Sequence, residues 1–128
     1  MNFQTQISLS KETRFPIDYK ARLLLLGSCF SENIGNKLKY YKFSSVQNPF
    51  GILFHPKAIE SLLENAINAE EFTEEDIFNS NEGWHSFAAH SQLSSTSQEK
   101  TLQKLNQAIK ITQKQLVKST HIIITLGT

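Results

Sequence analysis

Two short apolar runs, each ending at a glycine, dominate the hydrophobic pattern of this chain. Residues 21–26 (ARLLLL) are nearly all apolar and stop at Gly27, and residues 122–126 (IIITL) stop at Gly127. Apolar runs of this length without polar alternation are typical of parallel strands buried on both faces. The pattern therefore predicts two buried parallel strands that are far apart along the chain.

A helix is predicted directly after the first of these strands. It opens at Ser31, and its apolar stripe consists of Ile34, Leu38 and Tyr41, spaced as one side of a helix requires. Gly35 lies inside this helix, where a glycine costs about 1 kcal/mol relative to alanine. Its presence indicates close packing of the helix against the sheet.

The middle of the chain alternates between turns and helices. Residues 42–47 form a weak predicted strand that stops at a strong turn signal, residues 48–51 (NPFG). Pro56 starts a second helix, because the missing N–H of proline is harmless in a first turn. The buried face of that helix is predicted to be Ala58, Ile59, Leu62, Leu63, Ala66 and Ile67. A short helix is expected near residues 73–78.

Residues 79–97 have no helical or strand periodicity and are predicted to form a loop that carries several aromatic residues and histidines. Thr96 and Glu99 fit a capping box at the start of a long third helix. Its apolar side is Leu102, Leu105, Ile109, Thr112 and Leu116, and it leads back to the strand at 121–126.

The order strand, helix, weak strand, helices, strand predicts an α/β fold with a parallel sheet. Right-handed crossovers bring the carboxyl ends of parallel strands to one edge. We therefore expect Gly27-Ser28, the turn from Asn48 to Gly51, and Gly127-Thr128 to converge there.

Composition excludes several classes of function. A chain of 128 residues with a formal net charge of +1 is one domain without a basic surface for nucleic acid. The single cysteine forms no internal disulfide, and no apolar segment is long enough for a signal sequence or a membrane span. We expect a cytoplasmic protein. No histidine pair has the spacing of a strong metal motif and no glycine motif fits a nucleotide, so no metal and no cofactor are expected.

The sequence also predicts how the N-terminal segment and the last strand are arranged. Residues 1–20 are mixed and polar, so we expect an arm that lies on the surface or packs along a sheet, followed by one domain over residues 21–128. A buried parallel strand needs a neighbour on each side. Stopping just after such a strand suggests a truncated domain, in which a missing C-terminal part, a domain swap or an oligomer covers the last strand.

Ser28 is the candidate nucleophile. It follows a strand and precedes a helix, at the kind of sheet edge where open α/β proteins bind ligands and where backbone N–H groups hold an oxyanion. A serine hydroxyl needs a nearby base, usually a histidine. The alternative is that Ser28 only caps the helix. Cys29 is the rival nucleophile, against the alternative that it is a small buried core residue.

Among the four histidines, His85 is the best candidate for contacting a substrate, with an ordinary hydrogen-bonded histidine as the alternative. His121 opens the last strand at its amino end, which is the wrong edge for this site. Asn48 and Gly51 are candidates for substrate binding, although turns use both residue types for backbone reasons alone.

Four segments, in this order, resemble blocks of the GSCFA domain family, named for its Gly-Ser-Cys-Phe-Ala motif. They are residues 26–35 (LGSCFSENIG), 48–56 (NPFGILFHP), 84–87 (WHSF) and 123–128 (IITLGT). The resemblance covers the chain from about residue 21 to its end. It departs from the family name at Ser31, where the motif has alanine.

The GSCFA family is grouped with the GDSL/SGNH hydrolases. The resemblance therefore implies a flavodoxin-like, three-layer α/β/α fold, truncated here after an internal strand, and an esterase, lipase or acyl-transfer activity. It gives Ser28 the nucleophile position, with its own N–H as one oxyanion donor. Gly51 supplies a second donor, and Gly127 begins the third block. The implied substrate is a small acyl ester, such as an acylated carbohydrate or lipid.

Two departures concern catalysis. The third block lacks the asparagine expected in SGNH enzymes, and no Asp-x-x-His unit matches their acid and base. We therefore predict the amino-terminal portion of a serine hydrolase that works through a Ser28 acyl-enzyme but has little or no activity as it stands. The alternative is a non-catalytic module that holds an anionic small molecule at the Gly27-Ser28 helix start.

Overall fold

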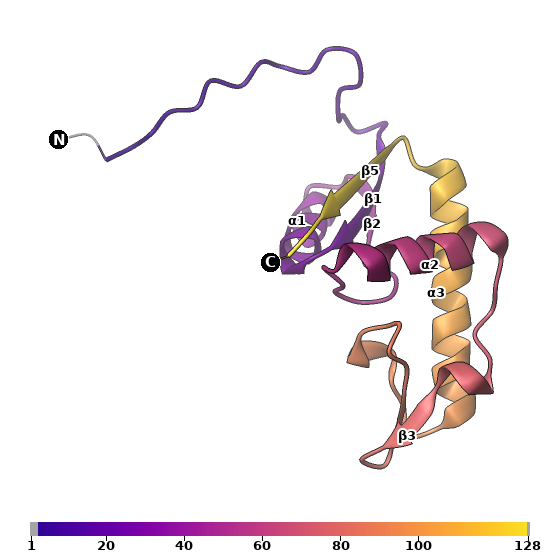
Figure 1. Cartoon of the computed structure of the whole chain (residues 1–128). Helices are drawn as coiled ribbons and strands as arrows, with labels where there is room; N and C mark the ends of the chain where they lie inside the picture. Colours follow the sequence, from indigo (N-terminus) through magenta and orange to yellow (C-terminus); the bar gives the residue numbers. More distant parts are fainter. Residues whose placement is uncertain (1–2, 128) are drawn as a thin grey trace.

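A three-stranded parallel sheet forms the upper half of the molecule (Figure 1). The computed structural model describes residues 3–127. Strand β1 (Arg22–Gly27) lies between β2 (Ser44–Gln47) and β5 (His121–Thr125), so that Leu24 pairs with Val46 on one side and with Ile122 on the other. Leu23 to Leu26 are buried, as the apolar run predicts. Strand β5 is different, because Ile122 and Ile124 are about half exposed.

Helix α1 (Cys29–Tyr40) covers one face of this sheet. Ile34 and Leu38 pack against Leu23 and Leu25 of β1, as predicted. The prediction is wrong for Tyr41, which is the C-cap residue and is exposed. A Cβ atom on Gly35 would lie 2.8 Å from side-chain atoms of Gln47. The predicted close packing at this glycine is therefore confirmed.

Helices α2 (Pro56–Asn68) and α3 (Gln98–Lys118) lie on the opposite face. There Leu24, Leu26 and Ile59 form a small core with side chains of α2 and α3 packed around it. Helices on both faces of a parallel sheet make a mixed α/β fold, as predicted. The first crossover, through α1, leads from β1 to β2, and the second, through α2 and α3, leads to β5 on the other side of β1.

A second core lies below the sheet, where α3 extends beyond it (Figure 1). Residues 72–109 contribute most of this part, which we call the hairpin lobe. Helix α2 and the turn at residues 48–51 also contribute to this core. Its buried apolar residues are Phe50, Leu62, Ala66, Phe72, Ile77, Leu105, Ala108 and Ile109. The 3₁₀ turn η1 (Glu74–Asp76) confirms the short helix expected near residues 73–78.

The prediction of a loop over residues 79–97 is wrong for part of this segment, which contains regular elements. Strands β3 (Phe78–Ser80) and β4 (Gly83–His85) form an antiparallel hairpin, and the 3₁₀ turn η2 (Ser91–Leu93) follows. The two-residue turn has Asn81 at φ 48° and Glu82 at φ 62°. A hairpin turn of this kind usually contains glycine, which is why the sequence gives little sign of it.

The cap of α3 also differs from the prediction. Ser97, and not Thr96, is the N-cap residue, and its hydroxyl accepts a hydrogen bond from the N–H of Lys100 at 3.3 Å. The helix therefore begins at Gln98.

The N-terminal arm is exposed along residues 3–20 and leads away from the body of the molecule (Figure 1). The expectation that it lies on the surface or along a sheet is wrong for its outer part. Near the body, Tyr19 stacks on Phe43 with ring centroids 4.5 Å apart, and Nε2 of His121 hydrogen bonds to the carbonyl oxygen of Phe15 at 3.0 Å. None of the helices over residues 3–127 has the length and apolar character needed to cross a bilayer.

Candidate functional site

The carboxyl ends of β1 and β5 approach so closely that only glycine fits at position 27. Gly27 has φ +127°, and a Cβ atom there would overlap the carbonyl oxygen of Thr125. The N–H of Ser28 donates to that same oxygen at 3.0 Å and to Oγ1 of Thr125 at 3.1 Å. The turn after β1 is therefore held against the end of β5 by its backbone.

Three hydroxyl groups form a hydrogen-bonded chain at this turn. Oγ of Ser31 donates to the carbonyl oxygen of Leu26 at 3.1 Å, and it lies 2.7 Å from Oγ1 of Thr125. Oγ of Ser28 lies 2.9 Å from Oγ1 of Thr125 on the other side. Since each hydroxyl has only one proton, Thr125 donates to Ser31 and Ser28 donates to Thr125. The proton of Ser28 thus points at a neutral hydroxyl.

Ser28 is half-buried and also caps α1. Its Oγ accepts a hydrogen bond from the N–H of Phe30 at 3.3 Å. Ser28 therefore caps the helix, as the alternative interpretation predicts, and it is also the candidate nucleophile. Cys29 next to it is exposed, so the interpretation of Cys29 as a buried core residue is wrong.

Asn48 ties the second motif to the first. This residue is 8% exposed and has φ 40°, and its Oδ1 accepts a hydrogen bond from the N–H of Gly27 at 2.9 Å. Its Nδ2 donates to Oε2 of Glu32 at 3.0 Å. Both ends of the buried amide are therefore occupied, and the carboxylate fixes its orientation. No sequence motif singles out Glu32 for this contact. Its position four residues after Ser28 places it on the same face of helix α1, which is the one signal that could have found it.

The segment after Asn48 also holds Gly127, which follows β5, at this edge of the sheet. The N–H of Leu53 donates to the carbonyl oxygen of Gly27 at 3.0 Å, and that of Gly127 donates to the carbonyl oxygen of Phe54 at 3.2 Å. The predicted convergence of Gly27, the Asn48 turn and Gly127 is confirmed. Thr128, which was expected here too, lies outside the described residues.

The two N–H groups that the family resemblance implies as oxyanion donors, and that of Gly127, already have acceptors. Those of Ser28, Gly51 and Gly127 donate to Thr125, Asn48 and Phe54, respectively. The N–H of Cys29, in the first turn of α1, has no acceptor among residues 3–127.

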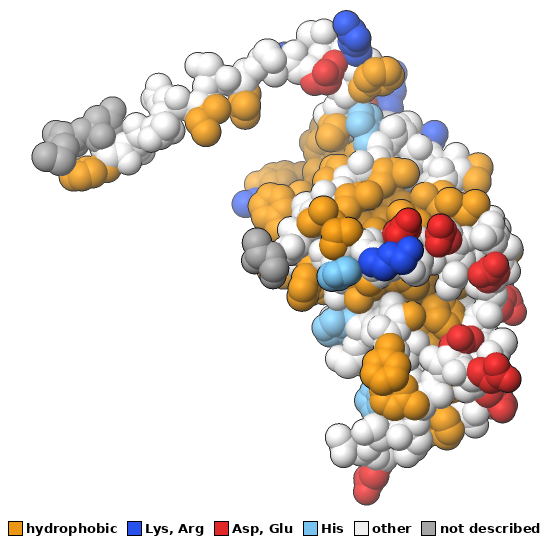
Figure 2. Space-filling model, in the orientation of Figure 1, with side chains coloured by type: hydrophobic (Ala, Val, Ile, Leu, Met, Phe, Trp, Pro, Cys, Tyr) orange, Lys and Arg blue, Asp and Glu red, His pale blue; other side chains and the backbone are white. Residues whose placement is uncertain are grey.

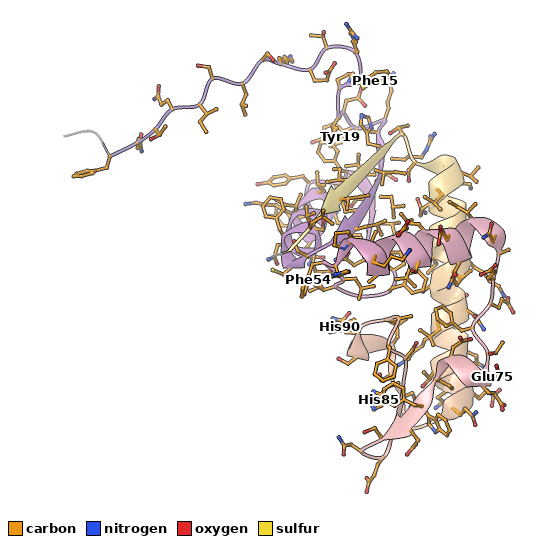
Figure 3. The ribbon with its side chains drawn as sticks, in the orientation of Figure 1. Phe15, Tyr19, Phe54, Glu75, His85 and His90 are labelled. Atoms are coloured by element: carbon orange, nitrogen blue, oxygen red, sulfur yellow. The ribbon has the colours of Figure 1, made fainter. Side chains whose placement is uncertain are left out.

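His85 does not lie at this edge. Figure 3 shows it in the hairpin lobe, well separated from Phe54. Its Nε2 hydrogen bonds to the carbonyl oxygen of Ser80 at 3.0 Å, and its Nδ1 to Oγ of Ser94 at 2.8 Å. Because the carbonyl can only accept, Nε2 carries the proton and Nδ1 accepts from Ser94. Both ring nitrogens therefore serve to hold the hairpin.

His90 is the histidine that packs on the Asn48–Gly51 turn. A Cβ on Gly51 would overlap the Cβ of His90, and the N–H of His90 donates to the carbonyl oxygen of Phe50 at 3.0 Å. Its Nδ1 accepts from the N–H of Gln92 at 3.2 Å, so a neutral ring has its proton on Nε2. No local sequence signal distinguishes His90 from His85, since contact with Gly51 depends on the tertiary fold.

A small apolar cavity lies beneath these corners. Gly27, Asn48 and Gly51 are among the residues that line it. Its volume is about 20 Å³, which is room for one water molecule or one methyl group. Among the described residues, no group of three histidines, cysteines or carboxylates is arranged to hold a metal ion.

Comparison with known proteins gives one match. The model of the GSCFA family matches residues 22–128, which is most of the chain. No curated protein and no solved structure matches.

Proposed function

The chain belongs to the GSCFA family, and we propose that it acts as a serine hydrolase of the GDSL/SGNH type, with a flavodoxin-like fold. In this proposal, Ser28 is the nucleophile and an acyl ester of a small molecule is the substrate. Ser28, the Asn48–Gly51 turn and Gly127 form the rim of the site.

The position of Ser28 carries this proposal. Ser28 follows the central strand β1; the first crossover runs from β1 to β2, and the second runs from β2 back past β1 to β5, so the direction of the winding reverses next to β1. In open α/β sheets, the carboxyl edge at such a reversal is where ligands bind. The half-buried Ser28 hydroxyl lies there, at the start of α1.

The proposed reaction transfers the acyl group in two steps. Oγ of Ser28 loses its proton to a base and attacks the carbonyl carbon, and the ester C–O bond breaks as the alcohol takes up a proton. Water then cleaves the acyl-enzyme. Among residues 3–127, no histidine, lysine or carboxylate is hydrogen bonded to Ser28 Oγ, whose proton is shared with Thr125. We therefore expect slow acylation and little turnover from this chain by itself.

Acetylation by p-nitrophenyl acetate tests the proposal. Intact mass spectrometry should detect one slowly added acetyl group on the wild-type chain, and peptide mapping should locate it on Ser28. The Ser28→Ala variant should not be acetylated. The matched control is Cys29→Ser, since the exposed thiol next to Ser28 is the rival nucleophile. Loss of acetylation in Cys29→Ser, with acetylation retained in Ser28→Ala, would exclude Ser28.

A second candidate function is a non-catalytic module that binds an anionic small molecule at the same turn. It is favoured by the unused N–H of Cys29 together with the absence of a base at Ser28 Oγ among residues 3–127. In that case inorganic phosphate or acetate should raise the unfolding temperature, and p-nitrophenyl acetate should leave Ser28 unmodified.

A further inference from the structure

Ser31 is the fully buried member of the hydroxyl chain at the turn after β1. It lies on α1 and is 0% exposed, and its Oγ donates to the carbonyl oxygen of Leu26 at 3.1 Å. That bond uses the only proton of the Ser31 hydroxyl, so Ser31 Oγ accepts from Oγ1 of Thr125 at 2.7 Å. The hydroxyl proton of Thr125 is therefore committed to Ser31.

This commitment determines how the Ser28 hydroxyl is oriented. Oγ of Ser28 lies 2.9 Å from Oγ1 of Thr125, whose proton is already used. Ser28 therefore donates its own proton to Thr125, and its Oγ accepts from the N–H of Phe30 at 3.3 Å. A serine hydroxyl attacks a carbonyl carbon only as it loses its proton to a base, and the hydroxyl of Thr125 is not a base.

We propose that Ser31 lowers the reactivity of Ser28 by binding the hydroxyl proton of Thr125, an inference that rests on Ser28 being the nucleophile. If position 31 offered no acceptor, Oγ1 of Thr125 would donate to Oγ of Ser28 instead. This reversal frees the Ser28 proton for a base. It also supplies a hydrogen bond to the oxygen that becomes negative as the proton leaves. Ser31 is thus a positioning residue that acts through Thr125.

The charged groups near the turn do not compete with this effect. None of them is hydrogen bonded to the three hydroxyls among residues 3–127, and Glu32 is bonded to Nδ2 of Asn48 at 3.0 Å. On the face that Figure 2 displays, most acidic side chains lie over α2 and the right-hand side of the molecule, away from the carboxyl end of β5. The direction of the hydrogen bonds within the chain therefore determines where the Ser28 proton points.

Acetylation by p-nitrophenyl acetate at one fixed pH tests this proposal on the wild type and Ser31→Ala. Hydroxide takes the Ser28 proton to give water, the bond from Oγ to the acetyl carbon forms, and nitrophenolate leaves. Peptide mapping over time gives the rate at Ser28. The rate should rise about fivefold in Ser31→Ala, as expected for one neutral hydrogen bond. Alanine is the residue of the family motif at this position, so we expect the variant to fold.

A double-mutant cycle with Thr125→Val tests whether Ser31 acts through Thr125. Thr125→Val alone should raise the Ser28 rate by less than Ser31→Ala does, because it frees the Ser28 proton without supplying a donor. Adding Ser31→Ala to Thr125→Val should leave the rate unchanged, since the proton for which the residues compete is gone. A general loosening of the turn by Ser31→Ala would instead raise the rate equally in both backgrounds.

The matched control is Thr101→Ala on α3. Thr101 is also buried, at 1% exposed, but its hydroxyl donates to the carbonyl oxygen of Ser97 and lies outside the chain. Its Ser28 rate should equal that of the wild type, and thermal unfolding checks that each variant is folded. Acetylation of Ser28 that is no faster in Ser31→Ala or in Thr125→Val, or that Ser31→Ala accelerates equally in both backgrounds, would overturn this proposal and leave Ser28 as the nucleophile. No acetylation of Ser28 in any folded variant would overturn the proposed function as well.

Discussion

The carboxyl edge of the sheet and the hairpin lobe are held together in different ways. At the edge, backbone meets backbone: Gly27 lies against Thr125, and Leu53 is bonded to Gly27. The lobe combines the backbone pairing of β3 with β4 with side-chain contacts: Trp84 packs on the core, and His85 is bonded to Ser80 and Ser94. An atom added at Gly27 on the edge would therefore overlap backbone, whereas one added at Gly83 in the lobe would meet the end of a side chain.

Glycine substitution should give the largest difference between the two regions. Gly27→Ala should lower the free energy of unfolding by at least about 3 kcal/mol, because the new Cβ overlaps the Thr125 carbonyl at a positive φ. Gly83→Ala in the lobe should cost less than about 1 kcal/mol, since the nearest atom is the tip of the His85 side chain at 3.0 Å. Urea unfolding measures both, and equal losses would contradict the comparison.

Two asparagines in left-handed conformation allow a matched test of the next largest effect. Asn48 has φ 40° and Asn81 has φ 48°, so glycine removes the side chain at either position without backbone strain. Asn48→Gly should destabilise by about 2 kcal/mol, because the N–H of buried Gly27 and the Glu32 carboxylate lose their partner. Asn81→Gly should change stability by less than about 0.5 kcal/mol. A similar loss at both positions would mean that the Asn48 amide is not a structural bridge.

Two threonine-to-valine substitutions should have smaller effects of opposite sign. Oγ1 of Thr125 is bonded to both Ser28 and Ser31, so Thr125→Val should destabilise by about 1 kcal/mol. Oγ1 of Thr112, on α3, is buried and has no hydrogen-bond partner among residues 3–127. Thr112→Val should therefore be neutral or stabilising by up to about 1 kcal/mol. Denaturant midpoints of the two variants measure the contrast, and destabilisation by Thr112→Val would indicate a partner for its hydroxyl.

The smallest effect is expected from an ion pair on α2. Nζ of Lys57 lies 2.8 Å from Oε2 of Glu60, and this hydrogen bond raises the pKa of Lys57. A raised pKa stabilises the fold at pH values below the ordinary lysine range, and the contribution disappears as the pH rises through the raised value. Because both groups are exposed, Lys57→Gln should leave the unfolding temperature at neutral pH almost unchanged. A clear drop at neutral pH that is absent at strongly alkaline pH would show a larger contribution.

Local patterns predicted the parts of the fold that depend on local chemistry. The leucine run gave β1, the stripe of Ile34 and Leu38 gave the buried face of α1, and the order of elements gave the meeting of Gly27 with Asn48. The hairpin was missed because Asn81-Glu82 is an unusual pair for its turn.

The order of the elements predicted which turns meet, but the individual side-chain contacts between distant residues could not be predicted. The hydroxyl chain joins Ser28 to Thr125, 97 residues later, and only the register between β1 and β5 creates it. The preference for His85 over His90 failed to locate the histidine at the turn for the same reason, since a long stretch of folded chain determines which of them contacts Gly51. Solvent exposure of Cys29 likewise depends on how α1 sits on the sheet.

Labelling with a fluorophosphonate probe, followed by peptide mapping, tests the central claim most directly. This reagent reacts with nucleophilic serine hydroxyls, and the chain offers many other serines as internal controls. The account predicts a single labelled residue, Ser28, with no labelling in Ser28→Ala. Labelling spread evenly over exposed serines, or none on Ser28 while the protein is folded, would contradict it.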